Sequence, residues 1–112
     1  MQDIISFTDF QKLDIRVGTI IEIFDFPQAK KPAYKLTVDF GNLGIKKTSA
    51  QITDYYSKEV LLGTQIVAIV NFPKKQIANF FSECLVLGVY DDKHQVILLR
   101  PDQKVGNGLF VG

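Results

Sequence analysis

The sequence predicts a mostly β protein, with short strands that close into a small barrel and short helices between them. Apolar residues recur at every second position in several short segments, and Gly, Pro, Asn and Asp separate these segments. A length of 112 residues is that of one domain. With 46% hydrophobic and 22% charged residues, the chain can bury enough apolar surface to fold without disulfides or metals.

Residues 3–12 are expected to form a short N-terminal helix. Ser6 and Asp9 have the spacing of a helix N-terminal cap, and Phe7 and Phe10 recur at helical spacing, which predicts one apolar face. An exposed apolar face requires a cover, so we expect it to lie in a dimer interface. The residues predicted at that interface are Ile4, Ile5, Phe7 and Phe10.

A long strand is expected after Asp14. Its alternation predicts that Ile15, Val17, Thr19, Ile21 and Ile23 share one face. Gly18 inside this strand predicts a bend or a bulge, which would let one strand serve both sides of a small barrel.

The next elements are a loop, two strands and a helix. The loop from Pro27 to Pro32 carries Lys30 and Lys31 at its tip, and residues 35–40 then alternate as a strand. Leu36, Val38 and Phe40 are expected to point inward, and a turn at residues 41–44 leads to a strand over residues 45–50. Residues 53–61 are expected to be helical, with Thr53 as the N-cap and Gly63 just past the end.

Three more apolar runs, Ile66–Val70, Leu85–Leu87 and Val96–Leu99, complete the expected strands. Three strands, a helix and further strands form the order of the five-stranded OB barrel. The fold class expected is therefore all-β with short helices: a five-stranded OB-fold barrel. It is expected as a single domain over 1–112, with a helical N-terminal extension at 1–12 and a C-terminal extension at 96–112.

The formal net charge of +1 conceals an uneven distribution. Residues 28–79 hold eight lysines against three acidic residues, a local charge of +5. In an OB barrel the second and third strands and the loops beside them bind oligonucleotides, and these lysines lie on or near those elements. The bland alternative is that the lysine pairs are simply solvated loop residues. The predicted nucleic-acid contacts are Lys30, Lys31, Lys35, Lys46, Lys47, Ser49, Gln51, Asn71, Lys74, Lys75, Ser82 and Glu83.

Two of these predictions leave alternatives open. Glu83 either pairs with a nearby cation or accepts a hydrogen bond from a base amino group. Phe80 and Phe81, which follow the basic loop, either stack on bases or anchor the loop in the core.

Little in the sequence favours catalysis or a cofactor. Cys84 is the only cysteine and lies in an apolar run, typical of an inert core residue, and His94 is the only histidine and is expected in an exposed turn. Asp91 and Asp92 are expected to be solvated turn residues, so we expect no metal, no cofactor and no enzyme activity. No signal peptide and no membrane-spanning stretch is recognisable, which predicts a cytoplasmic protein without membrane insertion.

Five segments together resemble one known family over roughly residues 9–112. They are Leu13–Gly18, Lys35–Gly41, Ser49–Thr53, Asn71–Pro73 and Ser82–Gly88, and their order and spacing resemble the stand-alone tRNA-binding OB domain. Within that family the chain is most similar to the CsaA group. Synthetase-appended members carry a His-Pro-Asn-Ala-Asp loop, where this chain has Phe-Pro-Gln-Ala-Lys-Lys-Pro at residues 26–32.

This resemblance implies an OB barrel, a homodimer built from the N- and C-terminal extensions, and recognition of tRNA by shape more than by sequence. For the CsaA group it also implies a role as an export-related chaperone that holds unfolded precursor polypeptides. Binding of such polypeptides requires an exposed apolar patch. The residues predicted for that patch are Phe24, Phe26, Tyr34, Phe72, Phe80 and Phe81.

Overall fold

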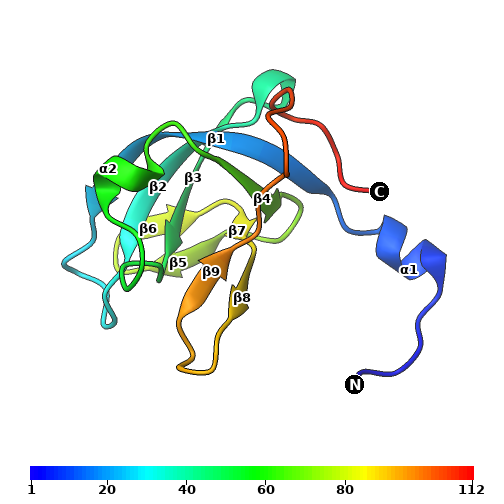
Figure 1. The fold of residues 1–112 in the computed structure, drawn as a ribbon, viewed down its shortest axis with the longest axis horizontal. Coiled ribbons are helices and arrows are strands. Elements are labelled where there is room, and N and C mark those ends of the chain that lie inside the picture. The colour runs from blue at the N-terminus through cyan, green and yellow to red at the C-terminus, as the bar shows by residue number, and fades with distance from the viewer.

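One antiparallel sheet curls into a barrel in the computed structural model, which describes residues 1–112 (Figure 1). Its five strands lie in the order β3-β2-β1-β4-β7. They are β1 (Ile15–Asp25), β2 (Tyr34–Asp39), β3 (Ile45–Ala50), β4 (Gln65–Ile69) and β7 (Leu85–Val86). The helix α2 (Lys58–Leu61) lies between β3 and β4 in the chain, so the predicted OB-fold order is confirmed.

Two hairpins and two further short helices complete the fold. The hairpins are β5 (Lys75–Ile77) with β6 (Phe80–Ser82), and β8 (Gly88–Tyr90) with β9 (Val96–Leu98), and the helices are α1 (Phe7–Gln11) and the 3₁₀ helix η1 (Gly41–Leu43). The sequence did not predict β5, β6 or β8. Their turns contain Ala78 and His94 at φ angles of 54° and 58°, where glycine or asparagine would be the usual signal.

β1 pairs on both of its edges. Residues 15–19 pair with β4 and residues 19–25 pair with β2, with a register shift between Ile20 and Glu22. Such a bulge adds one residue to the strand and reverses which side chains face inward. Ile20 lies on the inward face with Gly18 and is fully buried, and Ile23, beyond the bulge, packs against the same core. Ile21 between them is 39% exposed, so the prediction that Ile21 and Ile23 share one face is wrong.

Gly18 allows the close approach of two strands. The bend that this glycine predicts lies further along β1, at the bulge. A Cβ atom built at Gly18 would lie 2.6 Å from Cγ1 of Val38 and 2.8 Å from the Phe40 ring. β1 therefore packs against these core side chains only because residue 18 has no side chain.

The core lies inside the barrel and confirms the alternation of β2. Leu36, Val38 and Phe40 are each exposed by 1% or less. The remaining buried residues of this cluster are Ile20, Tyr34, Ile52, Leu61, Ile66, Ala68, Cys84 and Leu98.

Both α-helices are shorter than the sequence predicts. α1 begins at Phe7 after the expected cap, Ser6, whose hydroxyl accepts a hydrogen bond from the Asp9 amide. α2 begins after Ser57, and the prediction of Thr53 as its N-cap is wrong. Tyr56 explains the late start, because its carbonyl accepts from the Tyr34 hydroxyl and its hydroxyl accepts from the Leu98 amide. These long-range bonds hold the chain before Ser57 outside the helix.

The segment that precedes β1 and the C-terminal tail adjoin each other where β1 begins. The C-terminal tail runs beside β1, with hydrogen bonds from the Val17 amide to the Leu109 carbonyl and from the Val111 amide to the Ile15 carbonyl. α1 projects from the same end, away from the barrel, and buries none of its residues (Figure 1). None of the helices is long and apolar enough to cross a membrane.

Replacing Gly18 by Ala is expected to destabilise the fold by about 1–3 kcal/mol, because the added methyl group would overlap Val38 and Phe40. Urea denaturation of both proteins measures the difference. Gly106→Ala is the matched control, since a Cβ there would meet nothing closer than Leu109 carbons at 3.9 Å. Equal stability of the two variants would contradict the packing role of Gly18.

Candidate nucleic-acid interface

A groove of about 1320 Å³ lies between loops that converge on one side of the barrel. Its walls come from the β1–β2 loop at residues 28–33, the end of β3 with the residues after it at 49–54, and the segment 72–78. Six predicted contact residues line it together: Lys30, Lys31, Ser49, Gln51, Lys75 and Ser82.

The groove carries more positive than negative charge. Lys30, Lys31 and Lys75 line it, and Asp54 is its only carboxylate. None of the three lysines takes part in an ion pair. Their ammonium groups are therefore available to an anionic ligand.

Part of the groove lining is apolar, and this part is named the floor here. It includes the buried Ile52 and Cys84 together with Leu85, Val86 and Val96. Burial raises the pKa of the Cys84 thiol to about 11, so this thiol is protonated at neutral pH. Cys84 is thus an apolar part of the wall, as expected of an inert core cysteine.

Two of the predicted lysines on β2 and β3, Lys35 and Lys47, lie on the outer face of the sheet. Lys46 lies on the opposite face. Lys35 pairs in register with Ser49, and Thr37 with Lys47. Because neighbouring residues of a strand point to opposite faces, Lys46 points away from Lys47. Lys46 lies opposite the core residue Val38, at the edge of the barrel interior.

Lys35 is held over two aromatic rings beside the groove. Its Nζ lies 5.5 Å from the centre of the Phe26 ring and 5.9 Å from that of Phe80. The two rings contact each other edge to face at 5.4 Å. Phe26 is buried and Phe80 half-buried, so this pair anchors the loops and orients the Lys35 ammonium.

Side-chain hydrogen bonds close the barrel where β3 meets the segment 82–84. The Thr48 hydroxyl donates to the Cys84 carbonyl at 2.7 Å, and the Ser49 amide donates to the Ser82 hydroxyl at 2.9 Å. The Glu83 carboxylate accepts from the Lys47 amide at 2.8 Å. In return the Glu83 amide donates to the Lys47 carbonyl at 2.8 Å.

This closure answers the question that the sequence left open for Glu83. Its second carboxylate oxygen lies 3.7 Å from the Lys74 ammonium, so both oxygens have a partner within the chain. Glu83 is therefore a structural residue, and its carboxylate partly neutralises the positive charge of Lys74.

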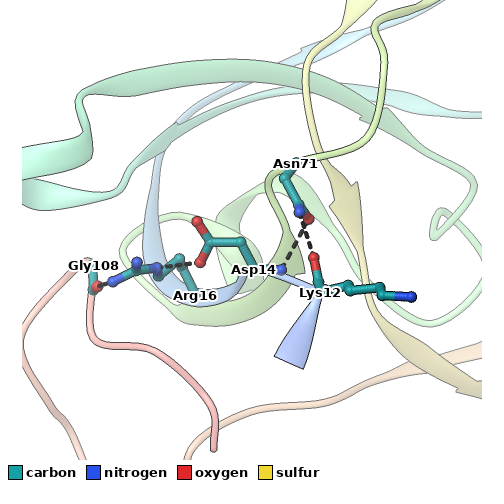
Figure 2. A network of polar contacts seen from close by, with 5 residues as sticks. All are labelled: Lys12, Asp14, Arg16, Asn71 and Gly108. Atoms are coloured by element: carbon teal, nitrogen blue, oxygen red, sulfur yellow. Dashed lines mark hydrogen bonds and ion pairs between the residues drawn. The ribbon is translucent and has the colours of Figure 1, made fainter. Parts of the chain in front are cut away.

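Asn71 joins the groove loop to the N-terminal segment (Figure 2). Its amide nitrogen donates to the Lys12 carbonyl at 2.7 Å, and its amide oxygen accepts from the Asp14 amide at 2.9 Å. Asp14 in turn binds the Arg16 guanidinium, which donates to the Gly108 carbonyl at 2.9 Å. These five residues, here named the terminal clasp, connect β1, the C-terminal tail and the start of segment 72–78.

The aromatic residues predicted to bind polypeptide do not form one exposed patch. Phe26 and Tyr34 are buried in the fold, which contradicts their placement in an accessible patch. Phe24, Phe72 and Phe81 are exposed, but of these three only Phe72 lines the groove.

The residues predicted at a dimer interface lie on the projecting N-terminal segment. Ile4 is 98% exposed, and Ile5 and Phe7 are also exposed. Phe10 is half-buried, with its ring 5.9 Å from that of Phe7.

Several groove residues were not identified from the sequence. The groove is also lined by Gln28, Gln76, Tyr90 and His94. These residues were missed because they lie in turns and short strands without a recognisable motif. Asp91, beside them, accepts from the amides of Lys93 and Gln95 at 2.9 Å and so stabilises its own turn. A hydrogen bond from the Tyr55 hydroxyl lowers the pKa of the Asp91 carboxyl.

The barrel topology defines an OB-fold domain, and comparison with known proteins identifies its family. Residues 15–109 match the family model described as "Putative tRNA binding domain". The chain belongs to this tRNA-binding-domain family.

Two solved structures are similar over the whole chain. CsaA of Bacillus anthracis str. Ames, described as a chaperone, has a TM-score of 0.94 and 46% identity, and the match covers 98% of this chain and 100% of that one. The CsaA chaperone protein of Picrophilus torridus has a TM-score of 0.91 and 51% identity, with coverages of 97% and 100%.

The curated relatives are much longer proteins. The methionine–tRNA ligase of Thermococcus onnurineus is 39% identical over 104 residues, which is 93% of this chain and 14% of that enzyme. The chain therefore spans about one seventh of the length of the curated relatives of this kind.

Replacing Asn71 by Ala is expected to destabilise the protein by about 1–3 kcal/mol, because two hydrogen bonds of about 0.5–1.5 kcal/mol each are lost. Chemical denaturation measures the loss, and amide hydrogen exchange at Asp14 should become faster. Asn42→Ala is the control, since the Asn42 side chain is exposed and makes no hydrogen bond. An unchanged exchange rate at Asp14 would show that the clasp is not formed.

Proposed function

We infer that the protein is a non-catalytic, cytoplasmic tRNA-binding protein that recognises tRNA by its shape through the basic groove. The observation that carries this proposal is the set of three lysines, Lys30, Lys31 and Lys75, which line one groove without internal ion pairs. Membership of the tRNA-binding-domain family supports it.

The proposed contacts fall into two groups. Lys30, Lys31, Lys75 and Gln51 in the groove, with Lys35 and Lys47 on the outer face beside it, supply cations and an amide to sugar and phosphate. Asn71, Ser82 and Glu83 already use their side chains inside the fold, so we propose that they position the lysine-bearing segments. We propose that Lys46, at the edge of the barrel interior, and Lys74, which is paired with Glu83, contribute only to the general positive charge.

A second candidate function is binding of unfolded precursor polypeptides. Two CsaA chaperone structures are similar over the entire chain at 46% and 51% identity, and the groove floor is apolar. Of the predicted patch, Phe72 is the residue placed to contact a bound segment, because it is exposed and lines the groove.

We propose that the protein acts as a homodimer. Ile4, Ile5 and Phe7 project from the barrel with their apolar side chains in solvent, and α1 buries no residue. A second copy of the chain would cover these side chains and recover the free energy of removing apolar surface from water.

Replacing Lys30 and Lys31 together by Ala is expected to weaken tRNA binding and to flatten its salt dependence. Loss of two phosphate contacts should reduce the slope of log K against log salt by about 1.4–1.8. Fluorescence anisotropy with labelled bulk tRNA, titrated from low to physiological salt, measures both quantities.

The control for this experiment is Lys93→Ala with Lys104→Ala, which removes the same charge from outside the groove. If both double variants change the slope equally, the groove assignment is wrong.

An unfolded precursor peptide is titrated in parallel. Its binding through apolar contacts should persist or tighten with salt. Peptide binding without tRNA binding would overturn the leading proposal in favour of the second.

Replacing Ile5 and Phe7 together by Ser is expected to convert the dimer to a folded monomer, because it removes exposed apolar surface from the projecting segment. Light scattering at micromolar concentration measures the mass, and circular dichroism verifies the fold. Phe24→Ser, at an exposed phenylalanine on β1, serves as control and should remain dimeric. A monomeric unmodified protein would contradict the proposal at once.

A further inference from the structure

The groove has two chemically different zones that a single ligand would have to match. Lys30, Lys31 and Lys75 supply positive charge, whereas Ile52 and Val86 belong to an apolar floor. A paired RNA stem presents phosphates and sugars at its surface and keeps its bases stacked inside. Such a stem would satisfy the lysines and leave the apolar floor uncovered.

Aromatic side chains at the walls offer surfaces for stacking. Phe72 is 44% exposed and Tyr90 is 70% exposed, and both line the groove. The Tyr90 ring lies 6.3 Å from the His94 ring, which lines the same groove. Exposed aromatic rings of this kind bind bases that have been released from a helix stack.

Unused amide groups lie between the charged and the apolar zones. Gln28 and Gln51 line the groove, are exposed, and make no side-chain hydrogen bond within the protein. A glutamine amide carries both a donor and an acceptor, which suits the edge of an unpaired base. By contrast, Ser49 and Ser82 bind each other and are occupied.

We propose that this groove holds unpaired nucleotides of RNA, with the bases against the apolar floor and aromatic walls and the phosphates at the lysines. The inference rests on the proposed tRNA binding and specifies which part of the RNA enters the groove. That part is a single-stranded loop or end, because a paired stem keeps its bases stacked inside and offers none of them to the apolar floor. The charge of the lysines favours this occupant over an uncharged apolar peptide segment.

Competition between RNA ligands tests this proposal with the unaltered protein. Labelled bulk tRNA is bound first, and then an eight-nucleotide oligouridine, an abasic oligonucleotide of the same length and a blunt RNA duplex are added separately. Oligouridine is expected to displace tRNA at a concentration about 5-fold or more below that of the abasic strand, the effect of one lost base stack. Equal displacement by the abasic strand or by the duplex would overturn the proposal.

A variant pair locates the bases. Phe72→Ala is expected to weaken oligouridine binding by between about 5-fold and about 150-fold, and to leave binding of the abasic strand within about 2-fold. Phe24→Ala is the matched control, because Phe24 is exposed like Phe72 but lies outside the groove. Thermal unfolding verifies that both variants are folded. Equal losses in the two variants, or an equal loss for the abasic strand, would contradict the inference.

The two proposals fail in different ways. If bulk tRNA binds and oligouridine does not compete, tRNA binding stands and the single-strand inference is wrong. If bulk tRNA does not bind, the proposed function itself is wrong. If an unfolded precursor peptide displaces bound tRNA and oligouridine does not, the inference is also wrong. The peptide would then be the ligand of the groove.

Discussion

The structure depends on one constraint: the strand β1 must pair along both of its own edges, with β2 and with β4, inside a sheet that closes on itself. β1 pairs with β4 over residues 15–19 and with β2 over residues 19–25, and the bulge between Ile20 and Glu22 interrupts the pairing with β2. Gly18 lets the strand pass close to the Phe40 ring without a collision. A bulge increases local twist, and this twist helps a sheet of only five strands to close around a small core.

Closure of the barrel also shapes the candidate site. β3 meets the segment 82–84 through side-chain bonds and one backbone bond instead of a regular ladder, with Thr48, Ser49 and Glu83 as the main contributors. The loops beside this junction converge to form the groove. Polar side chains that join the strands are thereby withdrawn from ligand binding, whereas the lysines of the same segments stay available. Stability and recognition use different residues of the same surface.

The terminal clasp connects this site to the ends of the chain. Asn71 immediately precedes the groove residue Phe72, and its side chain binds the backbone at Lys12 and Asp14. The same network holds the C-terminal tail through Arg16. The apolar N-terminal segment therefore leaves the barrel in a direction set by residues that adjoin the groove.

The sequence by itself determined the order of the five barrel strands, the inward face of β2 and the concentration of lysines in residues 28–79, because period-two alternation and local charge are properties of neighbouring residues. Only the tertiary structure decided that Ile20 and Ile23 both face the core while Ile21 does not, since a one-residue bulge is set by pairing with β2. It also decided the roles of Glu83 and Asn71. Their partners lie 36 and 57–59 residues away in the chain, where no local pattern reports on them.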